Sequence, residues 1–239
     1  MLTVPPYGCA SRTDIDPLAT IFRGALVIDL VLIRHGETAW NAERRLQGHL
    51  DVELNETGLR QAELLAQVLQ GERFDAIHCS DLSRARKTAA PLAAALGLHP
   101  VVDRAWRERC YGAFEGHAYD EIAKLFPEAY AAMRARAKDY RYPQGVNTAE
   151  TLLEFAARTV GALMQALQSG ARRIAIVTHG GVLDCINHHA RGIDLSQPRD
   201  FEIPNAGINR LSWDGKALKI MQWADTDHLA GLALDEIDQ

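Results

Sequence analysis

The sequence predicts an α/β fold, with three α/β/α layers around a mostly parallel central sheet. Apolar, β-rich runs alternate along the chain with stretches of helical apolar spacing, as in layered α/β domains. Two of these runs end alike, in Ile33-Arg34-His35-Gly36 and in Val177-Thr178-His179-Gly180. Ligands of such sheets bind beyond the carboxyl ends of the strands. Both imidazoles can therefore reach one crevice.

The composition narrows the class of function. The chain has 239 residues and a formal net charge of -5, so we expect no general attraction to nucleic acid or to anionic membranes. Any positive field that binds an anion must be local. The four cysteines have neither zinc nor disulfide spacing, and no signal peptide or membrane-spanning run is visible. We therefore expect a cytoplasmic protein, and the oligomeric state stays open.

We expect residues 1–24 to form an N-terminal extension outside the fold, because they lack periodicity and carry several prolines. Residues 25–239 are predicted to form a single domain. The apolar run 25–33 is typical of a central strand with both faces covered. Asn55 is a candidate N-cap for the helix that follows it, since apolar residues recur there at helical spacing.

The rest of the chain continues the alternation. The expected elements are a strand at 74–79, a helix capped by Asp81 or Ser83 and ended by Gly97, a short strand at 101–102, helices over 118–138 and 148–168, a strand at 173–177, a helix from about 182, and a hairpin that turns at Asp214-Gly215. The Asp-Gly pair predicts a type I′ turn.

Two arginines strengthen the case for an anion site at the strand ends. Arg34 precedes His35, and Arg84 begins the helix after the second expected strand. Guanidinium groups bind phosphate oxygens in pairs, and glycines after the histidines let a ligand approach the backbone. Free N–H groups at the helix N-termini add to the attraction for an anion. Either histidine alone would be weak evidence.

At these residues the sequence resembles the histidine phosphatase superfamily, whose fold is phosphoglycerate mutase-like. The resemblance covers about residues 28–230. Five segments carry it in chain order, namely Leu32-Ile33-Arg34-His35-Gly36-Glu37-Thr38, Leu46-Gln47-Gly48-His49, Ser80-Asp81-Leu82-Ser83-Arg84-Ala85, Arg107-Glu108-Arg109-Cys110-Tyr111-Gly112 and Thr178-His179-Gly180-Gly181.

The resemblance implies a role for each matching residue. His35 would attack phosphorus and become a phosphohistidine, and Glu108 would protonate the leaving oxygen and then activate water. We prefer Glu108 to Glu37 as the acid, because its segment matches the acid position of the family. The residues that would hold the phosphoryl group are Arg34, Asn41, Gln47, Gly48, Arg84, His179 and Gly180.

Physical chemistry agrees with these roles. A histidine must be neutral to attack, and nearby arginines disfavour the imidazolium form. A phosphoryl transition state needs positioning and charge stabilisation, which two arginines and a second histidine supply without a metal. We therefore expect no metal and no cofactor, and a small phosphorylated metabolite as the partner.

Three functions are compatible with the sequence, and we rank them. A metal-independent phosphomonoester hydrolase ranks first, because the connector from Gly116 to about Thr148 lacks the long insertion of the cofactor-dependent mutases. Such a phosphoglycerate mutase, which would need 2,3-bisphosphoglycerate, is the alternative. A non-catalytic phospholigand-binding module is remote, since all five core residues are present. The segment Pro143 to Thr151 departs from the family's Pro-x-Gly-Glu-Ser, and Glu150 takes the glutamate's place.

One pair of histidines is assigned no chemistry. His188 and His189 lie in the middle of an expected helix, without an acidic partner at metal spacing. We expect a packing or surface role for them.

Overall fold

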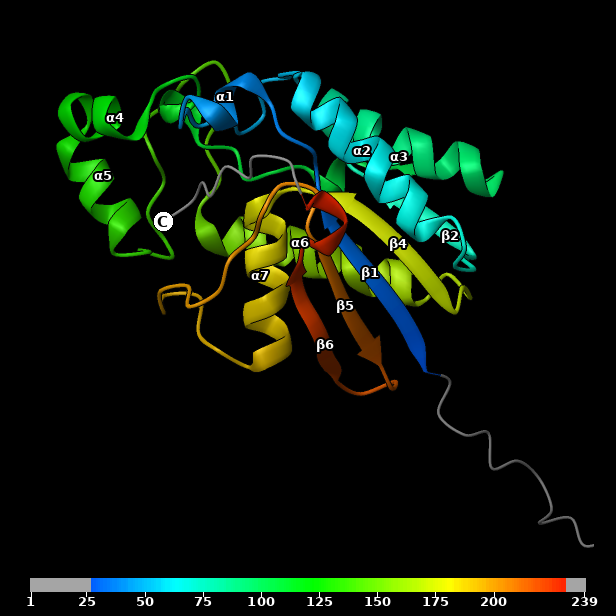
Figure 1. The fold of residues 1–239 in the computed structure, drawn as a ribbon. Coiled ribbons are helices and arrows are strands. Elements are labelled where there is room, and N and C mark those ends of the chain that lie inside the picture. Colours follow the sequence, from blue (N-terminus) through cyan, green and yellow to red (C-terminus); the bar gives the residue numbers. More distant parts are fainter. Residues whose placement is uncertain (1–26, 231–239) are drawn as a thin grey trace, which may run out of the picture.

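The computed structural model describes residues 27–230, which form a six-stranded sheet covered by helices (Figure 1). The strand order is β3-β2-β4-β1-β5-β6. The strands are β1 (Ile28–Arg34), β2 (Ala76–Cys79), β3 (Val101–Val102), β4 (Arg173–Thr178), β5 (Ile208–Trp213) and β6 (Leu218–Asp225). Counted from the β3 edge, the first four strands of the sheet pair in parallel. Strand β5 pairs antiparallel with both β1 and β6.

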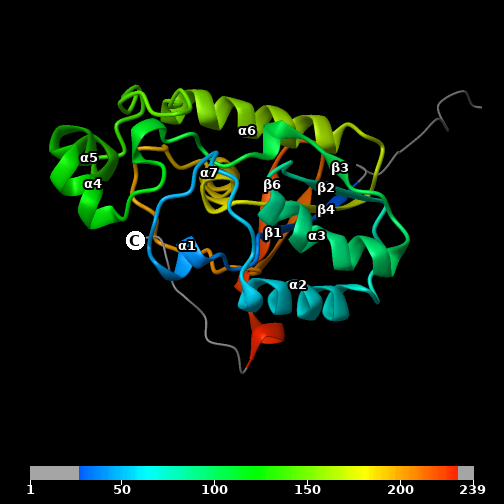
Figure 2. The ribbon, with the colours of Figure 1, turned by 90° about the horizontal axis from the view of Figure 1, so that it is seen from above.

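Helices cover both faces of the sheet, which confirms the predicted α/β class. Helices α2 (Glu56–Leu69) and α3 (Ser83–Leu96) lie on one face, and α6 (Leu152–Leu167) and α7 (Gly180–Arg191) lie on the other (Figure 2). Shorter helices α1 (Ala39–Ala42), α4 (Tyr119–Leu125) and α5 (Pro127–Arg134) stand outside these layers. Single 3-10 turns occupy Arg104–Trp106, Gly112–Phe114 and Asp227–Leu229.

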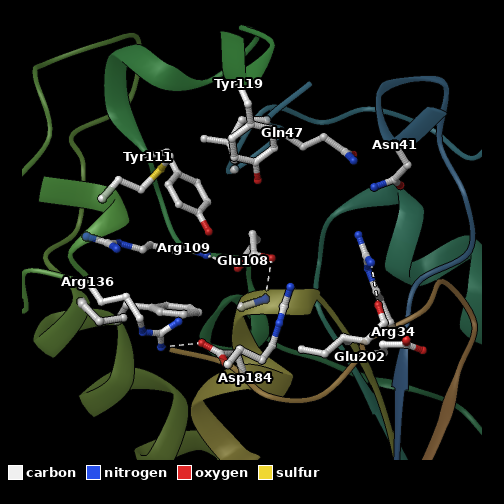
Figure 3. Close-up of a pocket in the computed structure, with 18 of the residues that line it drawn as sticks. Arg34, Asn41, Gln47, Glu108, Arg109, Tyr111, Tyr119, Arg136, Asp184 and Glu202 are labelled. Carbon is white, nitrogen blue, oxygen red and sulfur yellow. Dashed lines mark hydrogen bonds and ion pairs between the residues drawn. The ribbon is translucent and has the colours of Figure 1, made fainter. Parts of the chain in front are cut away.

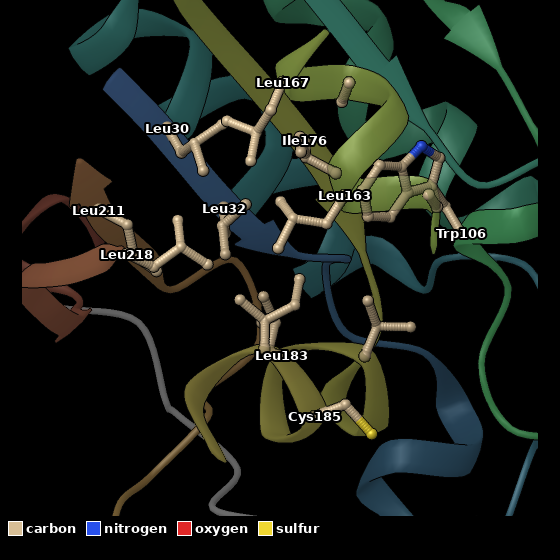
Figure 4. Close-up of a cluster of buried hydrophobic side chains, with 14 of the residues drawn as sticks. Leu30, Leu32, Trp106, Leu163, Leu167, Ile176, Leu183, Cys185, Leu211 and Leu218 are labelled. Atoms are coloured by element: carbon tan, nitrogen blue, oxygen red, sulfur yellow. The ribbon is translucent and has the colours of Figure 1, made fainter. Parts of the chain in front are cut away.

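The two faces of β1 enter two separate apolar clusters. Leu30 and Leu32 pack with Leu163 of α6 and Leu183 of α7 (Figure 4). The alternate residues Val31 and Ile33 face the cluster under α2 and α3. Successive strand side chains point to opposite faces, so a strand buried on both faces is apolar throughout. Burial of this strand anchors the backbone that carries His35.

The start of α3 differs from the prediction. Neither Asp81 nor Ser83 acts as the N-cap, because Leu82 holds that position and offers no side-chain hydrogen bond. The backbone N–H and the hydroxyl of Ser83 donate instead to the Asp51 carboxylate, each over 2.8 Å. The cap is thus supplied from a loop distant in sequence, which local patterns cannot reveal. Gly97 ends the helix in the left-handed conformation, as predicted.

The hairpin is present, but the predicted type I′ turn is wrong. Trp213 pairs with Leu218, so four residues connect the strands. A type I′ turn needs a positive φ at both central residues, and Gly215 alone in this loop has one. The Asp214 carboxylate accepts the N–H groups of Lys216 and Ala217 and thereby organises a longer loop.

The expected helix over 118–138 is two helices. Phe126 leaves the helical region, with φ −134° and ψ 58°, and Pro127 begins α5. Proline disfavours helical backbone at the preceding residue and fits well at a helix start. The expected helix over 148–168 is shorter, since Thr151 caps α6 through a capping box. The predicted extension at 1–24 lies outside the described residues, and the single domain stays a prediction.

Candidate active site

The two histidines meet because β1 and β4 are adjacent parallel strands. Arg34 pairs with Thr178 in the register, so His35 and His179 leave the sheet side by side. The N–H of His35 donates to the carbonyl oxygen of Thr178 over 2.8 Å. The ring centroids of the two histidines lie 5.1 Å apart. The predicted convergence at the carboxyl ends of the strands is confirmed.

The ring of His35 is held in one orientation. Its Nδ1 lies 2.7 Å from the carbonyl oxygen of Gly36, and a carbonyl can only accept. Nδ1 therefore carries the proton, and Nε2 keeps its lone pair. Burial, then the charges of Arg84 and Arg34, hold the pKa of His35 well below 6.5. The neutral imidazole with a basic Nε2 is the form that a nucleophile needs.

His179 has the opposite tautomer. Arg84 Nε donates to His179 Nδ1 over 3.3 Å, which leaves the proton on Nε2. That Nε2 is buried and has no hydrogen-bond partner in the described part of the chain. Burial and the neighbouring Arg84 charge also keep the pKa of His179 well below 6.5. A buried donor without a partner is costly, so this atom is prepared for an acceptor from outside the protein.

Arg84 is a fully buried cation whose hydrogen-bond partners are neutral. Its terminal nitrogens donate to the carbonyl oxygens of Gly48 and Leu50, over 2.8 and 3.0 Å. Among residues 27–230, no carboxylate lies within ion-pair distance of its guanidinium. Burial lowers its pKa to about 10, so the group stays charged at neutral pH. A buried charge of this kind attracts a counter-anion.

Two further predicted ligands are fixed by their neighbours. Asn41 Oδ1 accepts the N–H of Thr38 over 3.1 Å, and its amide nitrogen points into the cavity (Figure 3). Arg34 lies next to it and donates to the carbonyl oxygen of Ile203 over 2.7 Å. Gln47 is buried, and its Oε1 has no partner in the described chain. All three side chains line the same cavity as His35.

Glu108 approaches the same region from a different element. Its two carboxylate oxygens accept the N–H of Arg109 over 2.7 Å and the N–H of Gly181 over 2.9 Å. A Cβ at position 181 would overlap the Glu108 carboxyl group, so any other residue there would displace that group from its present position. This contact explains the second glycine of Thr178-His179-Gly180-Gly181. Glu37, the rejected candidate for the acid, instead accepts a hydrogen bond from Asn55 Nδ2.

These groups line one cavity of about 640 Å³. It contains seven of the nine predicted site residues, which are Arg34, His35, Asn41, Gln47, Gly48, Arg84 and Glu108. His179 lies beneath its floor, in contact with His35 and Arg84. Gly180 is not among the lining residues, whereas Gly181 is. Gly48 has φ +53°, and a Cβ there would overlap Glu115.

The other side of the cavity was not predicted. We call it the far wall, and it consists of Tyr119, Met133, Arg134, Arg136, Tyr142 and residues 198–204. The first five come from the connector that holds α4 and α5, and the last segment follows α7. Tyr119 and Arg136 lie across the cavity from Arg34 (Figure 3). Three of the far-wall residues, Arg134, Arg136 and Tyr142, belong to a cluster of tyrosines and arginines at 130–142, which was the only signal in the sequence.

The interpretation of His188 requires a correction. His188 is buried, which fits the expected packing role. It also has an acidic partner, Asp184, four residues earlier in α7, so the prediction that it has none is wrong. Asp184 also accepts from Arg136 Nη2 over 2.7 Å. The Asp184 carboxylate, whose Oδ1 lies 3.3 Å from His188 Nδ1, raises the pKa of the imidazole. The three groups form an ion cluster in which Arg136 and Asp184 line the cavity and His188 is buried beside them.

The described residues contain no group of three or more His, Cys, Asp or Glu side chains that could hold a metal ion. Within residues 27–230, none of the helices combines the length and apolar character that crossing a bilayer demands.

A covered α/β sheet, with two histidines and buried arginines at its strand ends, defines a class of oxyanion-binding protein. A family model of the histidine phosphatase superfamily (branch 1) matches residues 30–226. The chain belongs to this superfamily, which confirms the resemblance.

Relatives in the family differ in their activities. Phosphoglycerate mutase-like protein 4 of Arabidopsis thaliana is 40% identical over 206 residues, covering 84% of this chain and 86% of the relative. A metal-independent phosphoserine phosphatase of the same plant is 36% identical over 209 residues, covering 86% and 85%. The structure also resembles a phosphoserine phosphatase of Entamoeba histolytica solved with 3-phosphoglyceric acid. That similarity has a TM-score of 0.72 and 25% identity, and covers 84% of this chain and 99% of the other.

Proposed function

We propose that the protein hydrolyses a small phosphomonoester through a phosphohistidine on His35, without a metal ion. The observation that carries the proposal is the complementary pair of tautomers. His35 offers a lone pair at Nε2, and His179 offers a buried N–H at its own Nε2. A nucleophile and an oxyanion donor side by side, next to buried Arg84, suit an attack on a phosphoryl group.

The first step transfers the phosphoryl group to the protein. Nε2 of His35 forms a bond to phosphorus while the bond from phosphorus to the ester oxygen breaks. Glu108 gives its proton to that leaving oxygen, and the alcohol departs. The Gly36 carbonyl keeps the proton on Nδ1 and stabilises the positive ring that forms. Arg34, Arg84 and His179 hold the three phosphoryl oxygens.

The second step returns the protein to its starting state. The Glu108 carboxylate accepts a proton from water as the water oxygen attacks phosphorus. The bond between phosphorus and Nε2 breaks, its electron pair returns to His35, and inorganic phosphate leaves. Glu108 is then protonated again for the next cycle. The two arginines and the N–H group of neutral His179 supply the charge stabilisation in these two steps, so no metal ion is required.

Hydrolysis is preferred to mutase activity for the proposed function. The connector between Gly116 and Thr148 contains only the short helices α4 and α5, which line one side of the cavity. A mutase must keep water away from its phosphorylated intermediate, and longer closing segments serve that purpose. The phosphatase name of one relative supports the same choice, although another relative is named mutase-like.

Phosphorus NMR in EDTA tests the proposal directly. The purified protein is incubated with a panel of phosphomonoesters that includes phosphoserine, and 3-phosphoglycerate with a trace of 2,3-bisphosphoglycerate. We expect inorganic phosphate to grow at the expense of one ester. Conversion to 2-phosphoglycerate without free phosphate would establish the mutase instead. Activity that disappears in EDTA and returns with a divalent ion would contradict the metal-free mechanism.

A further inference from the structure

Glu108 lies in a segment without regular structure. The 3-10 turn at Arg104–Trp106 ends before it, and residues 107–111 belong to no helix or strand. His35 and His179, by contrast, follow strands whose hydrogen-bond ladders fix the backbone. Backbone carbonyls that lack a ladder need other partners when they are buried. The position of the Glu108 carboxyl group therefore depends on whatever holds this segment.

Arg158 of α6 supplies several of these hydrogen bonds, and His49 Nε2 lies 2.8 Å from the carbonyl oxygen of Glu108. Arg158 Nη1 donates to the carbonyl oxygens of Ala105 and Arg107, over 3.0 and 2.9 Å. Its Nη2 donates to the carbonyl oxygen of Glu108 itself, over 3.2 Å. One guanidinium thus holds three carbonyl groups on the N-terminal side of the acid. A planar fork of donors is well suited to this arrangement, and lysine is not.

Glu150 holds the C-terminal side of the acid and also orients Arg158. Its carboxylate accepts Nε and Nη2 of Arg158, over 2.8 and 2.7 Å. The same carboxylate accepts the N–H of Cys110 over 2.9 Å, and the Glu150 N–H donates back to the Cys110 carbonyl. The carbonyl oxygen of Glu150 receives two hydrogen bonds from Arg109. Glu108 is therefore held on both sides by one ion pair.

We propose that the Glu150–Arg158 ion pair is a positioning device for the acid Glu108. The inference rests on the proposed function, because it assigns the pair to the proton-transfer step of that reaction. Neither side chain lines the cavity, so neither touches the substrate. The opposite charges compensate each other, and the pair fixes the backbone without changing the positive field around the phosphoryl group. A displacement of about 1 Å in a catalytic group costs roughly 100-fold in rate.

The test uses substrates that differ in their need for an acid. p-Nitrophenyl phosphate releases a phenolate that leaves without a proton, whereas phenyl phosphate benefits strongly from protonation. We measure kcat/KM, which reports the steps up to formation of the phosphohistidine. Glu150→Gln and Arg158→Lys are expected to lose roughly 10- to 100-fold on phenyl phosphate and less than about threefold on p-nitrophenyl phosphate. Glu108→Gln should show the same selectivity with a larger loss.

A nearby ion pair provides the matched control. Glu154 lies on the same helix and pairs with Arg141, but it contacts nothing in the segment around Glu108. Glu154→Gln should leave both substrates unchanged. Equal losses on both substrates in Glu150→Gln and Arg158→Lys would overturn the positioning role, since a partly misfolded sample loses them together. Full activity of His35→Ala on both substrates would instead reject the proposed function, and that result is independent of the two variants.

Discussion

The two ends of the cavity differ in what holds their side chains in place. At the phosphoryl end, His35, Arg84 and His179 are tied to backbone carbonyls or to one another, and all three are buried. At the far wall, the side chains come from short helices and from a loop, and Arg134 and Glu202 are exposed. Precise placement is needed where bonds break, and variation is tolerated where a leaving group is merely accommodated. Under the proposed function, the chemistry and the specificity therefore reside in different elements.

The largest expected effect comes from the phosphoryl end. His35→Ala removes the proposed nucleophile, and we expect phosphatase activity to fall by at least about 10⁴-fold. Alkaline quenching, under which phosphohistidine survives, should trap no phosphorylated protein in this variant. Rapid acid quenching should trap none either. The exposed His99 gives a matched control, since His99→Ala leaves the cavity intact. Retention of a labelled protein by the His35 variant would assign the nucleophile to another residue.

A smaller effect is expected at Gly181, whose backbone N–H donates to the Glu108 carboxyl group. Gly181→Ala adds a methyl group that overlaps the Glu108 carboxyl group, and it should lower kcat/KM roughly 100-fold with phenyl phosphate. Gly161 in α6 is the control, because a Cβ there meets no other group. Gly161→Ala should keep full activity and raise the free energy of unfolding by up to about 1 kcal/mol. Unchanged activity in the Gly181 variant would mean that the acid tolerates displacement.

The far wall should change binding and leave the chemical step intact. Arg199 lines the cavity and forms no hydrogen bond or ion pair with another residue of the described chain. Arg199→Gln removes one positive charge, so KM for an anionic alkyl phosphate such as 3-phosphoglycerate should rise severalfold, roughly 3- to 10-fold. The value of kcat and the thermal stability should stay the same. A fall in kcat with constant KM would place Arg199 in the phosphoryl-transfer step.

The phosphoryl end could be predicted from the sequence because its motif residues lie at the ends of strands that the sequence also predicts. Arg34 ends β1, and His35-Gly36 and His179-Gly180 follow apolar strands directly, so the rule for strand ends places them together. The tautomers and the role of Gly181 depend on atoms brought from other elements, so no local pattern contains them. The far wall was missed because α4 and α5 approach the site only through tertiary packing. The Asp51 cap of α3 was missed for the same reason.

The smallest expected effect is on the free energy of unfolding. Its pH dependence should have opposite signs for a histidine in each of the two regions. Burial and nearby arginines depress the pKa of His35 in the folded state, so below pH 6.5 the unfolded chain binds a proton that the folded chain does not. Stability contributed by neutral His35 is therefore present above pH 6.5 and is lost as the pH falls below it. His188, which pairs with Asp184 beside the far wall, has a raised pKa because of the Asp184 carboxylate. Its contribution is present below pH 6.5 and is lost as the pH rises through the folded pKa.

Urea unfolding at about pH 5 and about pH 8 checks both signs with two variants. His35→Asn removes the unfavourable titration. The difference in the free energy of unfolding between this variant and the unmodified protein should therefore favour the variant more at the lower pH than at the higher pH, by about 1 kcal/mol or more. His188→Asn should show the opposite trend, because it removes a favourable charge that exists at low pH. The comparison between variants cancels the titration of surface carboxylates, which both share. If both variants changed in the same direction, the pKa values of the two histidines would not be shifted in opposite directions, and the contrast between the neutral histidine at the phosphoryl end and the charged cluster beside the far wall would fail.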